Sequence, residues 1–300
     1  MKNLLACFSI KDYNKIMKRS IIASLFLLTI VLDALAFTIK DDAGRSVNIS
    51  KAKSIVVLSP AACDILEEIG ASSLIVGYTD YAKKPNSKAV NVGAFGALNI
   101  ERIIALKPDL VIMPKFTYER YGIKSLNTLG ISVFVFEPQS IEGIVEDVEK
   151  LGLITGKVDQ AKNQILNFKK ELDKLHEIKQ KPSAVFLVWL SPIIVAGNDT
   201  FISDAISAAG GQNIIKKDGW PEVTSEYLIE KNPMFLIVNS RLKSDFFKQN
   251  KLLNYFYKKH KVLFIDNTLI ERPSLNIIKG IKILNNYFYE NSNNNSGWQR

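Results

Sequence analysis

Short apolar runs alternate with helical patterns along most of the chain. Runs of this length between polar turns predict buried β-strands, and their alternation with helices predicts βα units on largely parallel sheets. A hairpin with a polar turn is predicted before them. The hairpin occupies residues 37–49 with its turn at 41–44, and the runs occupy residues 55–58, 74–76, 110–113, 133–136, 184–190, 193–196, 235–238 and 262–265.

Two segments repeat one another 125 residues apart, at residues 98–112 and 223–237. Each copy places a glutamate, Glu101 or Glu226, at the start of a short helix, then a proline seven residues later, then an apolar run. Proline cannot continue a helix, so the apolar run that follows it is predicted to be a buried strand.

The ends of the repeated helices carry the expected capping residues. Asn99 and Thr224 precede the two glutamates by two positions, where a polar side chain caps a helix and a first-turn carboxylate suits its dipole. A second pair of segments, residues 59–70 and 199–210, predicts two further helices that end at a glycine. The duplication therefore predicts two similar α/β lobes.

One apolar stripe connects the two halves. Residues at every third or fourth position of 158–179 are apolar, which predicts an amphipathic helix, and about 22 residues at 1.5 Å each give a rod of roughly 33 Å. The stripe consists of Val158, Ala161, Ile165, Phe168, Leu172, Leu175 and Ile178. The predicted division is a leader at 1–36, an N-terminal lobe at 37–138, helices including the connecting helix at 139–181, a C-terminal lobe at 182–289 and a disordered tail at 290–300.

The N-terminal segment has the pattern of a signal peptide. Met17-Lys18-Arg19 is a charged region, residues 20–32 are apolar, and Ala34-Leu35-Ala36 is a cleavage site of the small-x-small type. Cleavage after Ala36 predicts a soluble protein in the periplasm, with Met17 as an alternative start. Cys63 is then the single remaining cysteine, so no internal disulfide is expected.

The charge balance argues against nucleic acid as a partner. The chain has a net charge of +9, and residues 1–36 carry five basic and two acidic side chains, which leaves +6 for the rest. The lysines are scattered and are not interleaved with aromatic residues, unlike a nucleic-acid-binding surface.

Several motifs are distributed along nearly all of the predicted mature chain. They are Asp42-Ala43-Gly44-Arg45, Ser59-Pro60-Ala61 with Gly70, residues 76–81, residues 99–112, Leu151-Gly152 with Thr155-Gly156, Ala209-Gly210-Gly211 with Asn213, and residues 219–223. Together these segments resemble one family, the helical-backbone (class III) periplasmic solute-binding proteins of ABC importers for cobalamin, ferric siderophores or haem. Asp80-Tyr81 and Gly219-Trp220-Pro221 are most similar to the cobalamin-binding branch.

The resemblance implies a monomer with two lobes, one rigid connecting helix and a ligand cleft between the lobes. Its partners would be the importer's permease and ATPase, and it would hold no permanent cofactor. It also implies that Glu101 and Glu226 project from the lobe tips and meet arginines on the permease. The alternative for each glutamate is stabilisation of its own helix dipole by about 0.3–1 kcal/mol.

The cleft should be lined by loops that follow the strands. Aromatic faces there suit a flat macrocycle or a catechol, while basic side chains suit propionates, phosphate or anionic chelators. The candidates are Tyr78, Tyr81, Phe95, Lys115, Phe116 and Tyr118 in the first lobe and Trp189, Trp220, Arg241 and Arg272 in the second. By family position, Tyr81, Phe95 and Arg272 are preferred.

The transported ligand is expected to be a metal chelate, with a corrinoid first, a ferric siderophore second and haem third. Phe95 and Pro114 depart from the larger aromatic residues expected in cobalamin binders, so the three ligand classes stay open. Lys115, Arg241 and Arg272 favour an anionic siderophore.

Two other classes of function are disfavoured. His176 and His260 have no ligand-spaced neighbours, so no metal site is predicted. Ser59 follows a strand but lacks a G-x-S-x-G turn, and neither histidine is placed as its base, so an enzyme is not expected. The duplicated glutamates and the supply of aromatic residues argue against a structural or adhesion protein.

Overall fold

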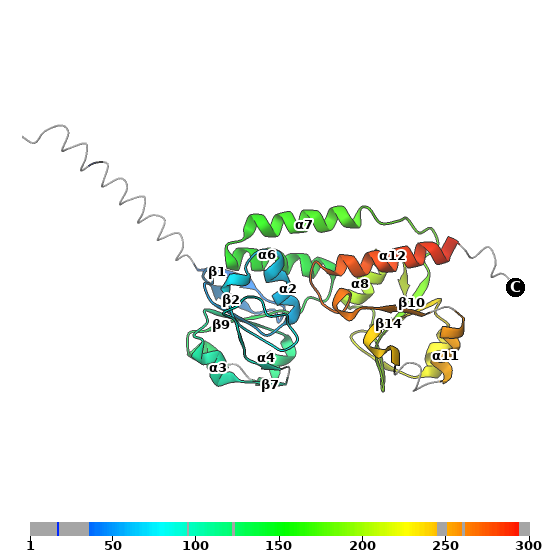
Figure 1. Ribbon diagram of the computed structural model, residues 1–300, viewed down its shortest axis with the longest axis horizontal. Coiled ribbons are helices and arrows are strands. Elements are labelled where there is room, and N and C mark those ends of the chain that lie inside the picture. The colour runs from blue at the N-terminus through cyan, green and yellow to red at the C-terminus, as the bar shows by residue number, and fades with distance from the viewer. Residues whose placement is uncertain are drawn as a thin grey trace, which may run out of the picture.

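Two α/β lobes lie side by side beneath a layer of helices (Figure 1). The computed structural model describes residue 17 and residues 36–94, 96–121, 124–244, 251–259 and 262–293. The predicted signal peptide at 1–36 lies outside the described residues apart from residues 17 and 36. Of the helices described, none is both long and apolar enough to cross a membrane.

The N-terminal lobe is built on a five-stranded parallel sheet in the order β5-β4-β3-β8-β9. Its strands are β3 (Ile55–Val57), β4 (Ile75–Tyr78), β5 (Val90–Asn91), β8 (Leu110–Met113) and β9 (Ser132–Val135). Two antiparallel pairs lie beside it, β1 (Phe37–Lys40) with β2 (Ser46–Ile49) and β6 (Gly93–Ala94) with β7 (Ala97–Leu98). The predicted hairpin and strands are confirmed.

The C-terminal lobe contains a six-stranded mixed sheet in the order β13-β11-β10-β14-β15, with β12 also paired to β10. Its strands are β10 (Ser183–Leu190), β11 (Ile193–Val195), β12 (Gln212–Asn213), β13 (Glu222–Val223), β14 (Phe235–Asn239) and β15 (Val262–Ile265). The β12, β10, β14 and β15 pairings are parallel, whereas β11 and β13 pair antiparallel at one edge. The predicted α/β fold with two lobes is confirmed.

Helices flank both sheets. The N-terminal lobe has α2 (Pro60–Glu68), α3 (Ile100–Ala105), α4 (Lys115–Tyr121) and α5 (Lys124–Thr128), and the C-terminal lobe has α8 (Phe201–Ala208), α9 (Ser225–Lys231), α11 (Lys251–Lys258) and α12 (Ile277–Asn293). Three 3-10 turns occupy Ser72–Leu74, Ser240–Leu242 and Asn267–Leu269. The predicted tail begins too early, because α12 continues to Asn293 while Phe288, near its end, is fully buried.

The predicted repeat is visible in the backbone. The side chains of Asn99 and Thr224 cap α3 and α9. Each accepts a hydrogen bond from the backbone N–H group three residues further along the chain, that of Arg102 or Tyr227. The residues just before the two prolines, Lys107 and Asn232, have positive φ of 45° and 42°. They are the two non-glycine residues with positive φ among those described, so the two copies share an unusual way of leaving the helix.

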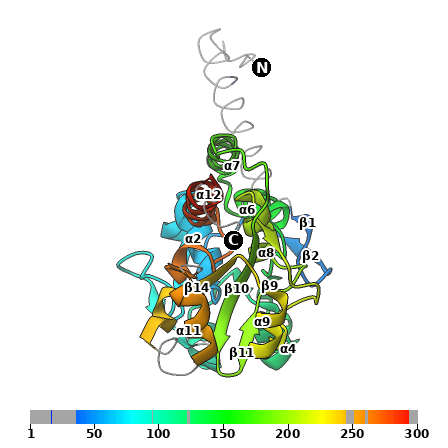
Figure 2. The ribbon, with the colours of Figure 1, turned by 90° about the vertical axis from the view of Figure 1, so that its right-hand side faces the viewer.

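Two antiparallel helices, α6 (Ile141–Thr155) and α7 (Val158–Leu172), form the connection between the lobes. Gly156 reverses the chain between them with a φ of 69°. α7 lies on top of α6 and reaches α12 (Figures 1 and 2), where Glu171 pairs with Lys282. The connecting helix is shorter than predicted, since it ends at Leu172 and residues 176–182 cross as coil.

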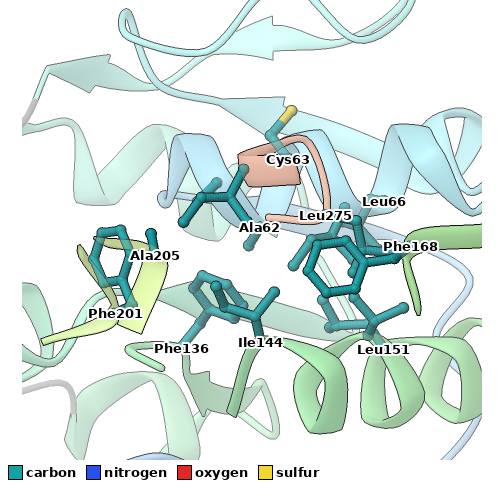
Figure 3. Close-up of a cluster of buried hydrophobic side chains, with 14 of the residues drawn as sticks. Ala62, Cys63, Leu66, Phe136, Ile144, Leu151, Phe168, Phe201, Ala205 and Leu275 are labelled. Carbon is teal, nitrogen blue, oxygen red and sulfur yellow. The ribbon is translucent and has the colours of Figure 1, made fainter. Parts of the chain in front are cut away.

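One buried cluster extends through both lobes (Figure 3). Alternate residues of β3 and β8 and of β10 and β14 enter it, as parallel strands covered on both faces require. Their other residues enter separate clusters on the far side of each sheet. The shared cluster also contains residues of α2, α6, α7, α8 and α12, so the helix layer and both sheets share one core.

Candidate functional site

A cleft of about 530 Å³ is lined by residues of both lobes. Many of its residues directly follow buried strands, which is where ligands bind in open α/β sheets, and its volume is in the usual range for small-molecule sites. The lining consists of Ser59, Pro60, Ala61, Asp80, Tyr81, Pro114, Phe116, Phe136, Glu137, Pro138 and Gln139 from the N-terminal lobe and its exit, and Phe201, Trp220, Arg241, Asn267, Glu271, Arg272 and Pro273 from the C-terminal lobe.

Aromatic side chains line both sides of this cleft. Tyr81 and Phe116 of the N-terminal lobe are 59% and 47% exposed, and Trp220 of the C-terminal lobe is 44% exposed. Buried Phe136 and Phe201 belong both to the cleft lining and to the shared core (Figure 3). Large apolar rings exposed on facing walls are available to stack on a ligand.

The position of Trp220 is fixed by its neighbours. Gly219 adopts a φ of 66°, and its N–H donates a hydrogen bond of 2.5 Å to Asp199. The indole of Trp220 packs edge-on against Phe201, with 6.2 Å between the ring centroids. The turn before the indole therefore has the conformation that favours glycine.

A half-buried carboxylate, that of Glu271, stands on the C-terminal wall. Both oxygens of Glu271 accept from the side-chain amide of Asn239 at 3.0 Å. Burial raises the pKa of Glu271 to about 7, although the hydrogen bonds from Asn239 and Asn267 and the charge of Arg241 act in the opposite direction. This wall therefore carries a proton acceptor that titrates near neutral pH.

Two further carboxylates belong to the N-terminal lobe. Glu137 accepts a hydrogen bond of 2.8 Å from the backbone N–H of Lys115, and Asp80 accepts one of 2.5 Å from the side chain of Asn91. Three carboxylates and two guanidinium groups thus line the cleft, so its wall is not basic although the chain as a whole is.

One of those guanidinium groups already has partners on the opposite lobe. Arg272 donates to Asp64 on α2, with its Nη1 at 3.0 Å and 3.3 Å from the two carboxylate oxygens. Its Nη2 donates to the backbone carbonyl of Tyr81 at 2.7 Å. Burial raises the pKa of Asp64, and the hydrogen bond from Arg272 opposes that rise.

Comparison with known proteins identifies the family. A sequence model described as a periplasmic binding protein matches residues 55–269. The chain belongs to this family. The family model covers the main sheets of both lobes and the helices that connect them, whereas the cleft residues Glu271, Arg272 and Pro273 lie beyond its end.

Individual relatives have different ligands in their names. A vitamin B12-binding protein of Yersinia pestis (strain Pestoides F) is 27% identical over 195 residues, which cover 63% of this chain and 70% of the relative. A structure from Staphylococcus epidermidis, described as a possible iron-binding (periplasmic solute-binding) protein, has a TM-score of 0.69 at 28% identity and covers 80% of this chain and 100% of its own.

A third similarity concerns the fold. The periplasmic heme binding protein HutB of Vibrio cholerae has a TM-score of 0.70 at 18% identity, covering 79% of this chain and 98% of its own. The two-lobe architecture of this periplasmic binding protein is therefore that of solved binding proteins.

Half of the ten side chains predicted to bind ligand are in the cleft lining. These are Tyr81, Phe116, Trp220, Arg241 and Arg272. Phe95 lies outside the described residues. The remaining four, Tyr78, Lys115, Tyr118 and Trp189, are described but do not line the cleft.

The four residues outside the lining have other surroundings. The backbone of Tyr78 belongs to β4 and its ring packs against the shared core. Lys115 contributes its backbone N–H to Glu137, and Tyr118 stacks under Arg45 at 4.1 Å. Trp189 donates from its indole N–H to Ser191 in the turn after β10. Whether a residue in such a loop lines the cleft depends on the direction of its side chain, and the sequence pattern does not specify that direction.

The sequence prediction missed the carboxylates of the cleft. Glu137 follows the apolar run that became β9, and Glu271 precedes Arg272. Both therefore lie in loops after strands, as the aromatic and basic candidates do. Acidic side chains in such loops are the sequence signal that indicates them.

The two repeated glutamates are exposed in the first turns of α3 and α9. Both helices lie on the side of their lobe that faces away from α7 (Figures 1 and 2). Glu101 and Glu226 are not part of the cleft lining. Their arrangement is compatible with contact to a partner that approaches from that side.

The histidines and the acidic groups form no metal centre within the described residues, where no cluster of three or more His, Cys, Asp or Glu side chains occurs. The backbone of His176 is held by Asn285, and its ring stacks on Tyr289. His260 lies outside the described residues.

Proposed function

We propose that this periplasmic binding protein captures a metal chelate in the inter-lobe cleft and delivers it to the permease of an ABC importer. The observation that carries the proposal is the set of exposed aromatic rings, Tyr81, Phe116 and Trp220, on both walls of one cleft. Such rings bury a large apolar area against a flat macrocycle. The signal-like pattern at residues 17–36 supports delivery of the protein to the periplasm.

The function proposed is binding and not catalysis. The relatives compared are named as solute-binding proteins for vitamin B12, iron or heme. The chelate is cargo, and the protein needs no permanent cofactor to hold it.

A corrinoid is the preferred cargo because of the charges in the cleft. Asp80, Glu137 and Glu271 present acceptor oxygens, and Arg272 is already paired with Asp64. The amide side chains around a corrin ring can donate hydrogen bonds to carboxylates, whereas catecholate oxygens and haem propionates would be repelled by them. The vitamin B12-binding relative supports the same preference.

A ferric siderophore or haem is the second candidate. Arg241 is an exposed cation on the cleft wall, and the iron-binding and heme-binding relatives share the fold. An anionic chelate would need that guanidinium as its main charged contact.

Titration calorimetry decides between these ligands. The purified mature protein is titrated with cyanocobalamin, a ferric catecholate, a ferric hydroxamate and haemin. We expect cyanocobalamin to bind with a Kd in the micromolar range or tighter. Binding of the catecholate without binding of cyanocobalamin would replace the corrinoid by a siderophore, and no heat with any chelate would contradict the proposed function.

We infer in addition that Glu101 and Glu226 contact the permease. They are duplicated, exposed and outside the cleft. Charged pairs at an exposed interface mainly steer the encounter and fix its orientation, which is what a receptor needs when it docks on a membrane partner.

A further inference from the structure

Helix α2 carries three carboxylates, Asp64, Glu67 and Glu68, which differ in their surroundings. Asp64 pairs with Arg272, Glu67 is exposed, and the carboxylate oxygens of Glu68, one helical turn after Asp64, are buried. Helix positions four apart share a face, so Asp64 and Glu68 both face residues 272–276. α2 therefore meets the C-terminal lobe through an acidic face.

The Asp64–Arg272 pair is well placed to control the cleft. The two side chains are 18% and 22% exposed, so water screens their attraction less than it would on an open surface. Arg272 uses one nitrogen for Asp64 and the other for the carbonyl of Tyr81. A guanidinium that donates in two fixed directions sets the position of both partners.

Tyr81 and Arg272 line the cleft from opposite lobes, whereas Asp64 is not in the lining. Asp64 holds the guanidinium, and the guanidinium holds the backbone that carries the Tyr81 ring. Loss of the Asp64 charge would leave Arg272 free to turn toward ligand and would release the Tyr81 loop.

We propose that Asp64 is a positioning residue for the ligand site: through Arg272 it fixes the Tyr81 loop of one lobe against the wall of the other. This inference rests on one part of the proposed function, namely that the cleft between the lobes binds the ligand. It reassigns Arg272, which acts as a bridge between the lobes and not primarily as a contact for an anionic ligand.

Distance measurement tests the positioning without any ligand. Spin labels are attached to cysteines introduced at exposed Lys83, two residues after Tyr81, and exposed Lys216, near Trp220. Cys63 is buried, and burial raises the pKa of its thiol to about 12, so it should not take label. We expect D64N to broaden the distance distribution between the labels.

E67Q is the matched control, because it removes the same charge from the same helix at an exposed position. It should leave the distribution unchanged. A D64N distribution that coincides with that of the unsubstituted protein would overturn the proposal, as would equal broadening in E67Q.

A mutant cycle on affinity separates a bridge from a direct contact. With cyanocobalamin as the probe, D64N and R272Q should each weaken binding about tenfold, and the double variant should be no weaker than either single one. If R272Q weakens binding while D64N leaves it unchanged or improves it, Arg272 contacts the ligand directly and the proposal is wrong. If cyanocobalamin does not bind at all, its assignment as ligand fails, and the spin-label distances still decide the role of Asp64.

Discussion

At the scale of single residues, two tryptophans of the C-terminal lobe offer a direct test of the cleft. Trp220 is 44% exposed and lines the cleft, whereas Trp189 is 52% exposed and lies beside the turn after β10. W220A should weaken the binding of the true ligand about tenfold through lost stacking. W189A, which removes an indole that is slightly more exposed, should change the Kd measured by calorimetry less than about twofold. Equal losses in both variants would contradict the position of the cleft.

Glu271 links stability to pH. Burial raises its pKa from 4.5 to about 7, so the folded protein binds this proton more tightly than the unfolded chain. The resulting stabilisation is complete below about pH 4.5 and is lost as the pH rises through about 7. Relative to the unsubstituted protein, E271Q should therefore gain roughly 1–3 kcal/mol of unfolding free energy between about pH 5 and pH 8.

Thermal or denaturant unfolding of both proteins at the two pH values measures this difference. Burial also raises the pKa of Glu68 to about 7, but Glu68 is present in both proteins, so its contribution cancels. A stability difference that is the same at both pH values would show that Glu271 does not titrate in this range.

Some candidate residues could be placed near the cleft from their position in the chain alone. Tyr81 and Phe116 lie three residues after β4 and β8 and line the cleft, whereas Trp220 lines it from a position two residues before β13. Their contact with ligand stays a prediction. Tyr118 does not line the cleft, because its helix turns the ring toward Arg45. The pair between Asp64 and Arg272 joins residues 208 positions apart, and no local pattern encodes such a contact.

At the scale of elements, α3 and α9 carry the proposed docking glutamates. E101K combined with E226K should abolish uptake of ligand by cells that depend on this protein, because both contacts with the permease would become repulsive. The Kd for ligand should stay within about threefold, since neither residue lines the cleft.

The matched control reverses two other exposed glutamates, Glu119 on α4 and Glu230 one turn further along α9. E119K with E230K makes the same change in net charge on the same two lobes. It should retain uptake. Normal uptake by the E101K/E226K variant, or loss of its ligand binding, would contradict the docking role.

The connecting element shows why a periodic pattern can overstate a helix. Leu175 and Ile178 continue the apolar spacing of α7 and still pack against the shared core, yet the helix ends at Leu172. The side chain of Asn285 accepts from the N–H of His176 and donates to its carbonyl. This tertiary contact satisfies the backbone of His176 in place of helical hydrogen bonds. Leu175 and Ile178 can therefore pack against the core although the helix has ended.

At the scale of the whole molecule, the duplication made the two-lobe fold predictable. Repeated strands and capped helices specify similar units, and a parallel arrangement follows from their alternation. The continuous core between the units was not predictable, because it depends on which faces of α2, α6, α8 and α12 meet. Figure 3 shows side chains of α2, α6 and α8 in this core. That core decides how far the lobes can move.

The shared core predicts that the two lobes move little relative to one another. Phe168 of α7, Phe201 of α8 and Leu275 before α12 belong to the same buried cluster as the strands of both lobes, and closing or opening the lobes by a large angle would expose it. Exposing apolar surface costs about 25 cal/mol per Å², so ligand binding should select small adjustments at the cleft. Small-angle scattering curves of the mature protein with and without its ligand should therefore nearly coincide. A decrease of several ångströms in the radius of gyration on binding would contradict this, because it would require the shared core to separate.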